Sequence, residues 1–173
     1  MLKNFDKEKY EQFVANIDHH GIELKSFYAD TTSYENVRHL SKDKILMKAF
    51  SQPIQILYFN KKDSLISVQA NCYAKGGLTN LNWNTDNRFN QFVPKSAINV
   101  KSAELTLSDF SRCYPNNLIS SDKKYTVIIY WTLMLEKISR SAIKMTIDNI
   151  RQFHKEKEVT IYLINNDKSF IQK

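Results

Sequence analysis

The two cysteines could do chemistry, because a thiolate attacks disulfides and holds metal ions. Cys72 and Cys113 lie far apart, and neither has a second cysteine or a histidine beside it at a metal-site spacing. We expect buried free thiols, or a disulfide between them if the protein is exported. The histidines are His19, His20, His39 and His154. They do not complete a metal motif either, so the sequence predicts no metal and no cofactor.

Motifs for nucleophilic catalysis and nucleotide binding do not occur in the sequence. No Gly-x-Ser-x-Gly turn presents a serine, and Cys113 precedes Tyr114-Pro115 in an expected loop without a nearby histidine base. Gly76-Gly77 is too short to cradle a phosphate, and the Gly-x-x-x-x-Gly-Lys pattern is missing. We therefore favour a non-catalytic function and leave the enzyme class open.

The loop at residues 71–84 combines amide and aromatic side chains, which form adaptable contact surfaces. The alternative is a structural loop whose asparagines hydrogen-bond their own backbone. We also expect the aromatic side chains of residues 75–96 to pack back onto the body, since long unanchored loops are uncommon in compact domains. The candidate binding residues of the loop are Asn71, Tyr73, Asn80, Asn82, Trp83 and Asn84.

A helix expected at residues 137–155 provides a second candidate surface. At 100° per residue its cations fall in one sector with Asp148, opposite an apolar sector. Exposed cations at this spacing can contact nucleic acid phosphates or an acidic protein, whereas an ordinary solvated helix face would look the same. The cations are Lys137, Arg140, Lys144, Arg151 and Lys155.

The charge balance favours acidic partners. The 173 residues include 25 Lys and Arg against 18 Asp and Glu, a formal net charge of +7, although the cations are spread along the chain. The most apolar run, residues 127–135, is much shorter than the about 20 residues that cross a bilayer, so we expect a soluble protein without a membrane span. The sequence as given indicates the cytoplasm; a removed leader would indicate the periplasm or a lipoprotein.

Hydrophobic spacing predicts helices before residue 50. Asp6 can cap a helix over residues 6–18 that ends at Gly21, and a weaker helical pattern covers residues 33–50. Pro53 marks a boundary. After it, residues 54–59 and 64–72 have the pattern of a β-hairpin.

The second half of the chain predicts an α/β core. A short strand is expected at residues 98–100, and Ser108 is expected to cap a short helix. Residues 125–131 and 159–164 are nearly continuous apolar strands on either side of the long helix. A strand, a crossover helix and a second strand of this kind lie parallel in one sheet.

Four features of residues 104–167 carry a resemblance. They are the turn Leu107-Ser108-Asp109-Phe110, the strand ending in Tyr130-Trp131, the long helix, and the strand that leads to Asp167. Together they resemble the first half of the thioredoxin-like domain found in extracytoplasmic thiol-disulfide oxidoreductases and peroxiredoxins. In those families a Cys-x-x-Cys pair begins the helix, where the helix dipole lowers the thiol pKa. In this sequence Leu135 and Ile138 occupy the two positions, which implies that no disulfide exchange occurs there.

The rest of the family pattern departs from this chain. The families have a cis-proline before the next strand, but no proline follows Pro115 here, so the second half of the fold is missing or replaced by the hairpin at residues 54–72, docked on the open sheet edge. We expect a single domain over residues 1–173, with a helical region at 1–50 and, at 53–173, the hairpin plus a thioredoxin-like βαβ core with a mixed sheet.

The resulting functional hypothesis is a non-catalytic thioredoxin-like module that binds a protein, with an acidic partner favoured by the charge. One alternative is a lone-thiol redox protein that uses Cys72 or Cys113. The other is weak nucleic-acid binding through the basic helix face.

Overall fold

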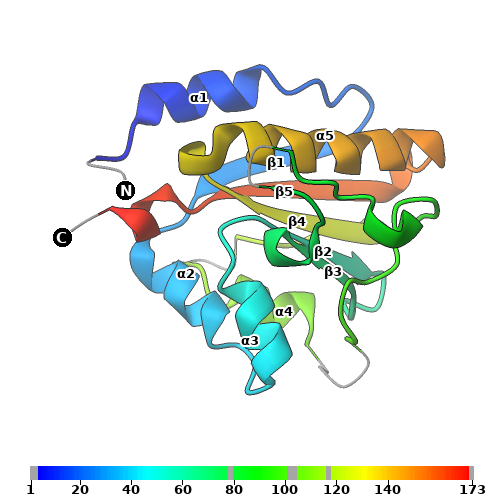
Figure 1. The fold of residues 1–173 in the computed structure, drawn as a ribbon, viewed down its shortest axis with the longest axis horizontal. Coiled ribbons are helices and arrows are strands. Elements are labelled where there is room, and N and C mark those ends of the chain that lie inside the picture. The colour runs from blue at the N-terminus through cyan, green and yellow to red at the C-terminus, as the bar shows by residue number, and fades with distance from the viewer. Residues whose placement is uncertain (1–3, 78–79, 101–104, 116–117, 172–173) are drawn as a thin grey trace.

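The computed structural model describes residues 4–77, 80–100, 105–115 and 118–171. Within these residues the chain forms five α-helices and five strands (Figure 1). The helices are α1 (Lys7–Ala15), α2 (Thr31–Arg38), α3 (Lys44–Phe50), α4 (Leu107–Ser111) and α5 (Glu136–Gln152). The strands are β1 (Glu23–Tyr28), β2 (Gln55–Asn60), β3 (Leu65–Ala70), β4 (Tyr125–Trp131) and β5 (Val159–Asn165).

The five strands form one mixed sheet in the order β1-β5-β4-β2-β3. Strands β1, β5 and β4 are parallel, and the register of β4 with β5 runs from Tyr125–Val159 to Trp131–Asn165. The hairpin β2–β3 joins β4 through antiparallel pairing of β2, which brings Gln55 opposite Tyr130. The α/β class, the mixed sheet and the docking of the hairpin on the core are therefore confirmed.

Helices cover both faces of the sheet. Helices α1 and α5 lie on one face, and α2, α3 and α4 lie on the other (Figure 1). Trp131 and Ile129 belong to the core under α5, whereas Leu57 and Phe59 pack with Phe110 on the opposite side. Because β2, β4 and β5 are buried on both faces, their sequences are almost continuously apolar, which made these strands recognisable.

Side-chain caps define the starts of four helices. Asp6, Asp30 and Asp43 accept hydrogen bonds from backbone N–H groups at the starts of α1, α2 and α3. Helix α4 begins after Thr106, whose side chain forms a capping box with Asp109. The expectation that Ser108 caps this helix is therefore wrong, because Thr106 and Asp109 already satisfy the first N–H groups.

Three further features of the structure differ from what the sequence predicts. Strand β1 was not predicted, and its polar residues Lys25 and Ser26 explain why it has no clear alternating pattern. Residues 98–100 form no strand; instead Ala97 N–H makes a hydrogen bond of 2.9 Å to the carbonyl of Val68 beside β3. Helix α1 ends at Ala15, and Gly21 lies in the following turn with φ +82°.

A helix that crosses a bilayer needs about 20 predominantly apolar residues. Among the described residues, no helix combines sufficient length with sufficient apolarity to span a membrane.

Candidate functional site

The carboxyl ends of parallel strands β4 and β5 lie side by side, and open α/β sheets bind ligands beyond such ends. Three segments meet there: residues 132–135 after β4, residues 165–167 at the end of β5, and residues 52–54 before β2. Asn166 Nδ2 donates a hydrogen bond of 3.0 Å to the Pro53 carbonyl, which joins the last two segments. We call these three segments the carboxyl-edge site.

A buried carboxylate holds the carboxyl-edge site together. Asp167 is only 1% exposed, and its Oδ1 accepts hydrogen bonds from the Thr132 hydroxyl and, at 2.9 Å, from the Leu133 N–H. Its Oδ2 accepts from the Asn165 side-chain amide at 2.9 Å. The Thr132 hydroxyl also accepts from the Met134 N–H at 3.1 Å. The backbone of the turn that precedes α5 is therefore fixed by side chains from both parallel strands.

The turn itself carries only apolar side chains. Residues Leu133–Leu135 form one 3-10 turn, and Met134 in its middle is 37% exposed. Leu135 is the N-cap residue of α5 without a side-chain capping bond, and Ile138 is buried in the core under α5. The two positions that the resemblance assigns to thiols thus hold hydrocarbon side chains, and no Cys-x-x-Cys pair is present.

A hollow of about 500 Å³ opens beside the turn. Leu133 and Asp167 line one side of it, and residues 4–7 with Lys9 line the other. The ring of Phe5 lies 4.8 Å from the ring of Tyr28. The hollow therefore presents apolar surface, lysine side chains and the rim of the fixed turn to a ligand.

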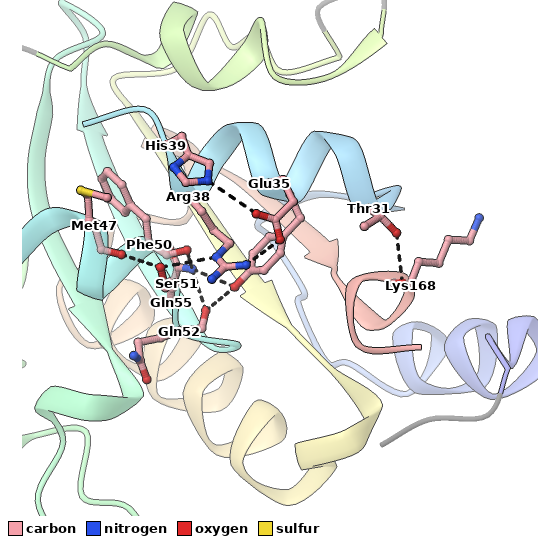
Figure 2. Close-up of polar contacts among 11 residues, drawn as sticks. Thr31, Glu35, Arg38, His39, Met47, Phe50, Ser51, Gln52, Gln55 and Lys168 are labelled. Carbon is pink, nitrogen blue, oxygen red and sulfur yellow. Dashed lines mark hydrogen bonds and ion pairs between the residues drawn. The ribbon is translucent and has the colours of Figure 1, made fainter. Parts of the chain in front are cut away.

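A second polar cluster supports residues 50–55 from the side of α2 and α3 (Figure 2). Gln55 is fully buried, and its Nε2 donates to the carbonyls of Gln52 at 2.7 Å and Phe50 at 2.8 Å. The Tyr34 hydroxyl donates to the same Gln52 carbonyl at 2.7 Å. Burial raises the pKa of Tyr34 well above its ordinary value, so this hydroxyl remains a donor at neutral pH. The segment that leads into β2 is consequently held in one conformation.

Pro53 lies two residues before Gln55, the first residue of β2, which pairs with β4. The resemblance implies a proline beyond the last parallel strand, but no proline follows Pro115, and the hairpin β2–β3 precedes β4 in the chain. Among the described residues the cis peptide bond joins Phe92 to Val93, so Pro53 follows a trans bond.

The asparagine-rich loop packs against the body, as expected. Trp83 is 1% exposed and lies in the core under α5, so its side chain is not available to a partner in this structure. Asn84 accepts a hydrogen bond from the Phe89 N–H at 2.8 Å, and Tyr73 is half-buried beneath Lys48.

The remaining loop candidates differ in position. Asn71 contacts the carboxyl-edge site, because its Oδ1 accepts from the Ile54 N–H at 3.2 Å and its Nδ2 donates to Gln52. Asn80 and Asn82 are both exposed, and the Asn82 N–H is bonded to the Lys75 carbonyl. Most of the amide groups of the loop with described bonds therefore serve loop structure, and Asn71 alone of the six candidates bonds to the edge segments.

The basic stripe on α5 is largely paired with acidic groups. Arg140 forms an ion pair with Glu136, and Lys144 forms one with Asp148, each one turn away on the same helix. Arg151 pairs with Asp18 in the segment after α1. Lys155 pairs with Glu158, so of the five cations only Lys137 has no ion partner among the described residues. This face therefore offers less free positive charge than its sequence suggested.

The two cysteines are free. Cys113 is buried, as expected, and burial raises the pKa of its thiol to about 11. Cys72 is exposed, which corrects the expectation of two buried thiols, and its pKa is also raised because its surroundings desolvate the thiolate. Neither thiol has the lowered pKa that a reactive cysteine requires.

The histidines are scattered, with His19 Nδ1 3.0 Å from the Ile22 carbonyl and His39 beside Glu35. In the described part of the chain no three His, Cys, Asp or Glu side chains converge as metal ligands would.

The central residues of the carboxyl-edge site were not among the sequence candidates. Thr132, Asp167 and Gln55 are each polar residues at the boundary of a buried strand. Polar residues directly after two apolar strands were the available signal, because parallel strands place their carboxyl ends together.

Comparison with known proteins adds no family assignment. No family model matches the chain, and neither the curated proteins nor the solved structures contain a significant match.

Proposed function

We propose that this chain is a redox-inactive, thioredoxin-like module that binds a protein partner at the carboxyl-edge site. The sheet supports the fold part of the proposal, since three parallel strands are followed in space by an antiparallel pair. In the thioredoxin-like domain that pair comes after the core in the chain. Here the hairpin β2–β3 precedes β4 and would replace it, with Pro53 at its entrance.

The exposure of Met134 on a fixed turn is the observation that carries the functional part. An apolar side chain that is 37% exposed gains free energy when a partner covers it. The hydrogen bonds from Leu133 and Met134 to Asp167 and Thr132 hold the turn in place before any partner binds. Binding to such a turn loses little conformational entropy, and a single apolar anchor in a central position often dominates an interface.

The chemistry of the surroundings favours a peptide segment with apolar and acidic residues. Lys7 and Lys9 line the hollow beside the turn together with Asp6, and Lys7 also pairs with Glu11 on α1. The protein as a whole carries a net charge of +7. The raised pKa values of Cys72 and Cys113 do not favour the lone-thiol alternative. The ion pairs along α5 do not favour nucleic-acid binding.

The proposal is tested by selecting peptides from a displayed random library on the immobilised protein. The binding of the enriched peptides is then measured for the native protein, for Met134→Lys and for Ile45→Lys. Ile45 is a matched control because it is an exposed apolar residue, 55% exposed, at the start of α3. We expect Met134→Lys to abolish binding and Ile45→Lys to leave it unchanged, because a lysine on the turn places a charge in the apolar contact.

Equal loss in both variants, or no loss in Met134→Lys, would exclude the carboxyl-edge site. Failure to enrich any peptide would also count against it. The redox-inactive part is tested separately by reduction of a protein disulfide in the presence of dithiothreitol: catalysis above the rate of the reductant alone would refute it.

A further inference from the structure

We propose that the outer edge of β1 binds an extended, acidic segment of a partner protein as a sixth strand of the sheet. This surface runs along β1 and reaches the carboxyl-edge site only at Tyr28, beside Phe5, and it does not depend on the function proposed for that site.

The two edges of the sheet differ in their cover. At the β3 edge, Val68 N–H donates to the Ser96 hydroxyl at 3.0 Å and the Leu65 N–H donates to the Leu105 carbonyl at 2.9 Å. The segment after the asparagine-rich loop therefore closes that edge. On the outer side of β1, no residue in the described ranges forms a backbone hydrogen bond with the strand. An open edge is a template for strand addition.

The register identifies the backbone groups that face outward. The N–H of Ala29 donates to the Asn165 carbonyl of β5 at 2.8 Å. Because alternate residues of a strand face opposite neighbours, the backbone of residues 23, 25 and 27 also faces β5. The N–H and C=O groups of Leu24, Ser26 and Tyr28 consequently face away from the sheet, in a row that an added strand could pair with.

The charges and the exposed side chains along the β1 edge indicate which kind of partner segment would bind there. Lys25 is exposed on β1 and forms an ion pair with Glu23 at 3.0 Å, and Lys168 Nζ lies 4.2 Å from the ring centroid of Tyr28. Lys123 is close enough to help lower the pKa of Glu23, after the hydrogen bonds from Lys25 and Thr160. Lys25 and Lys123 thus lie near Glu23 at the start of β1, and Lys168 lies beside Tyr28 at its end. Three lysines along the edge outnumber the one glutamate, which favours an acidic strand. A second copy of the chain would bring the same positive charge to the contact and is disfavoured.

Tyr28 adds an apolar contact at the end of the edge. Its side chain is 39% exposed and lies beside Phe5. An incoming strand that carries an apolar residue opposite Tyr28 and acidic residues opposite Lys25 would complement both features. Main-chain hydrogen bonds would supply affinity, and these side chains would supply specificity.

The probe is a synthetic peptide of about eight residues in which Glu alternates with Val and Thr, compared with a matched peptide in which Lys replaces Glu. Amide hydrogen exchange of the protein is followed by NMR. We expect the glutamate peptide to slow exchange at Leu24, Ser26 and Tyr28 by about tenfold or more, and the lysine peptide to have little effect. No protection at these amides, or equal protection by both peptides, would overturn the proposal.

Backbone pairing is tested with two variants of one residue. Ser26→Pro removes the outward N–H, whereas Ser26→Ala keeps it and removes only the hydroxyl. We expect the proline variant to lose the peptide and the alanine variant to retain it; equal binding by both would refute strand addition.

A modified peptide gives an answer even if Ser26→Pro does not fold. Alternate N-methylation of the glutamate peptide, in the phase that removes the N–H groups facing β1, should abolish binding to the unmodified protein. Binding of the N-methylated peptide would refute backbone pairing. Dimerisation of the protein with protection of the same amides in the absence of peptide would instead identify a second copy as the occupant and overturn the acidic segment.

Discussion

Removal of the Asp167 carboxylate should destabilise the whole domain. In Asp167→Ala, the Leu133 N–H, the Thr132 hydroxyl and the Asn165 amide lose a charged acceptor inside the protein. A buried donor left without a partner costs about 1–3 kcal/mol. The Leu133 N–H cannot rotate toward another partner, and the lost bonds from the hydroxyl and the amide cost about 1 kcal/mol each even where these groups rotate toward new partners. We therefore expect a loss of about 3–5 kcal/mol in the free energy of unfolding.

The isosteric variant separates hydrogen bonding from charge. In Asp167→Asn, one oxygen can still accept from Leu133 and Thr132, but the new NH₂ group faces the Asn165 amide, which also donates. Rotation of the Asn165 side chain would sacrifice the bond from the Asp167 N–H to its Oδ1. A cost of about 1–2 kcal/mol is expected, between the native protein and the alanine variant.

Urea unfolding followed by circular dichroism measures these costs, with Asp148→Ala as the control. Asp148 is a carboxylate on the exposed face of α5 that pairs with Lys144, and its removal should change stability by less than about 0.5 kcal/mol. For a chain of this length, the midpoint of thermal unfolding of Asp167→Ala should fall by roughly 6–20 °C. A destabilisation no larger than that of Asp148→Ala would refute the role of Asp167 as the support of the turn.

Further predictions concern the thiols, the loop and the basic stripe. Burial raises the pKa of the Cys113 thiol from 9.0 to about 11, so the stability that the buried neutral thiol contributes is complete below pH 9 and is lost as the pH rises to 11. In Cys113→Ala, the free energy of unfolding should therefore fall less steeply between pH 9 and pH 11 than in the native protein. An unchanged slope in this pH range would contradict the prediction. Cys72 should react with a disulfide reagent at neutral pH no faster than free cysteine, and faster reaction would revive the thiol alternative. In Trp131→Phe, the remaining Trp83 fluorescence should be poorly quenched by iodide, whereas strong quenching would show that the loop opens. Lys144→Gln should leave the salt dependence of any duplex DNA binding unchanged, and a fall of about 1 in its slope would identify a phosphate contact.

The elements that could be predicted from the sequence are those whose burial leaves a local pattern of apolar residues. Helix α5 is buried along one face, so its apolar residues recur at helical spacing. Strands β4 and β5 are buried on both faces, so their sequences are almost continuously apolar. Strand β1 is an edge strand whose residues are half-buried or exposed, and its partner β5 lies more than 130 residues further along the chain. Such pairing leaves no local periodicity, and tertiary contacts decide it.

The candidate site was harder to predict because it depends on contacts across the sheet. The absence of sulfur at Leu135 and Ile138 followed from the sequence alone. The support of the turn did not, since Thr132 and Asp167 meet only after β4 and β5 pair in parallel. The asparagine-rich loop stood out by composition, yet Trp83 is buried and Asn84 bonds to its own loop. Composition identifies amide groups, but it does not indicate whether they face the backbone or the solvent.

The hydrogen-bond network of Asp167 has a cost in lost hydration, and this cost bears on what the network does. A buried carboxylate loses hydration on folding, and well-packed apolar residues at such a position are often as stabilising as a satisfied polar network. The start of α5 could have been capped by its own N-cap side chain, but Leu135 provides no capping bond, and residues from both parallel strands hold the preceding turn instead. This arrangement couples the position of Met134 to the register of β4 with β5. The buried carboxylate of Asp167 loses hydration, but its hydrogen bonds hold the turn in one geometry, and a recognition surface requires such a fixed geometry. The peptide selection with the Met134 variant tests this reasoning directly.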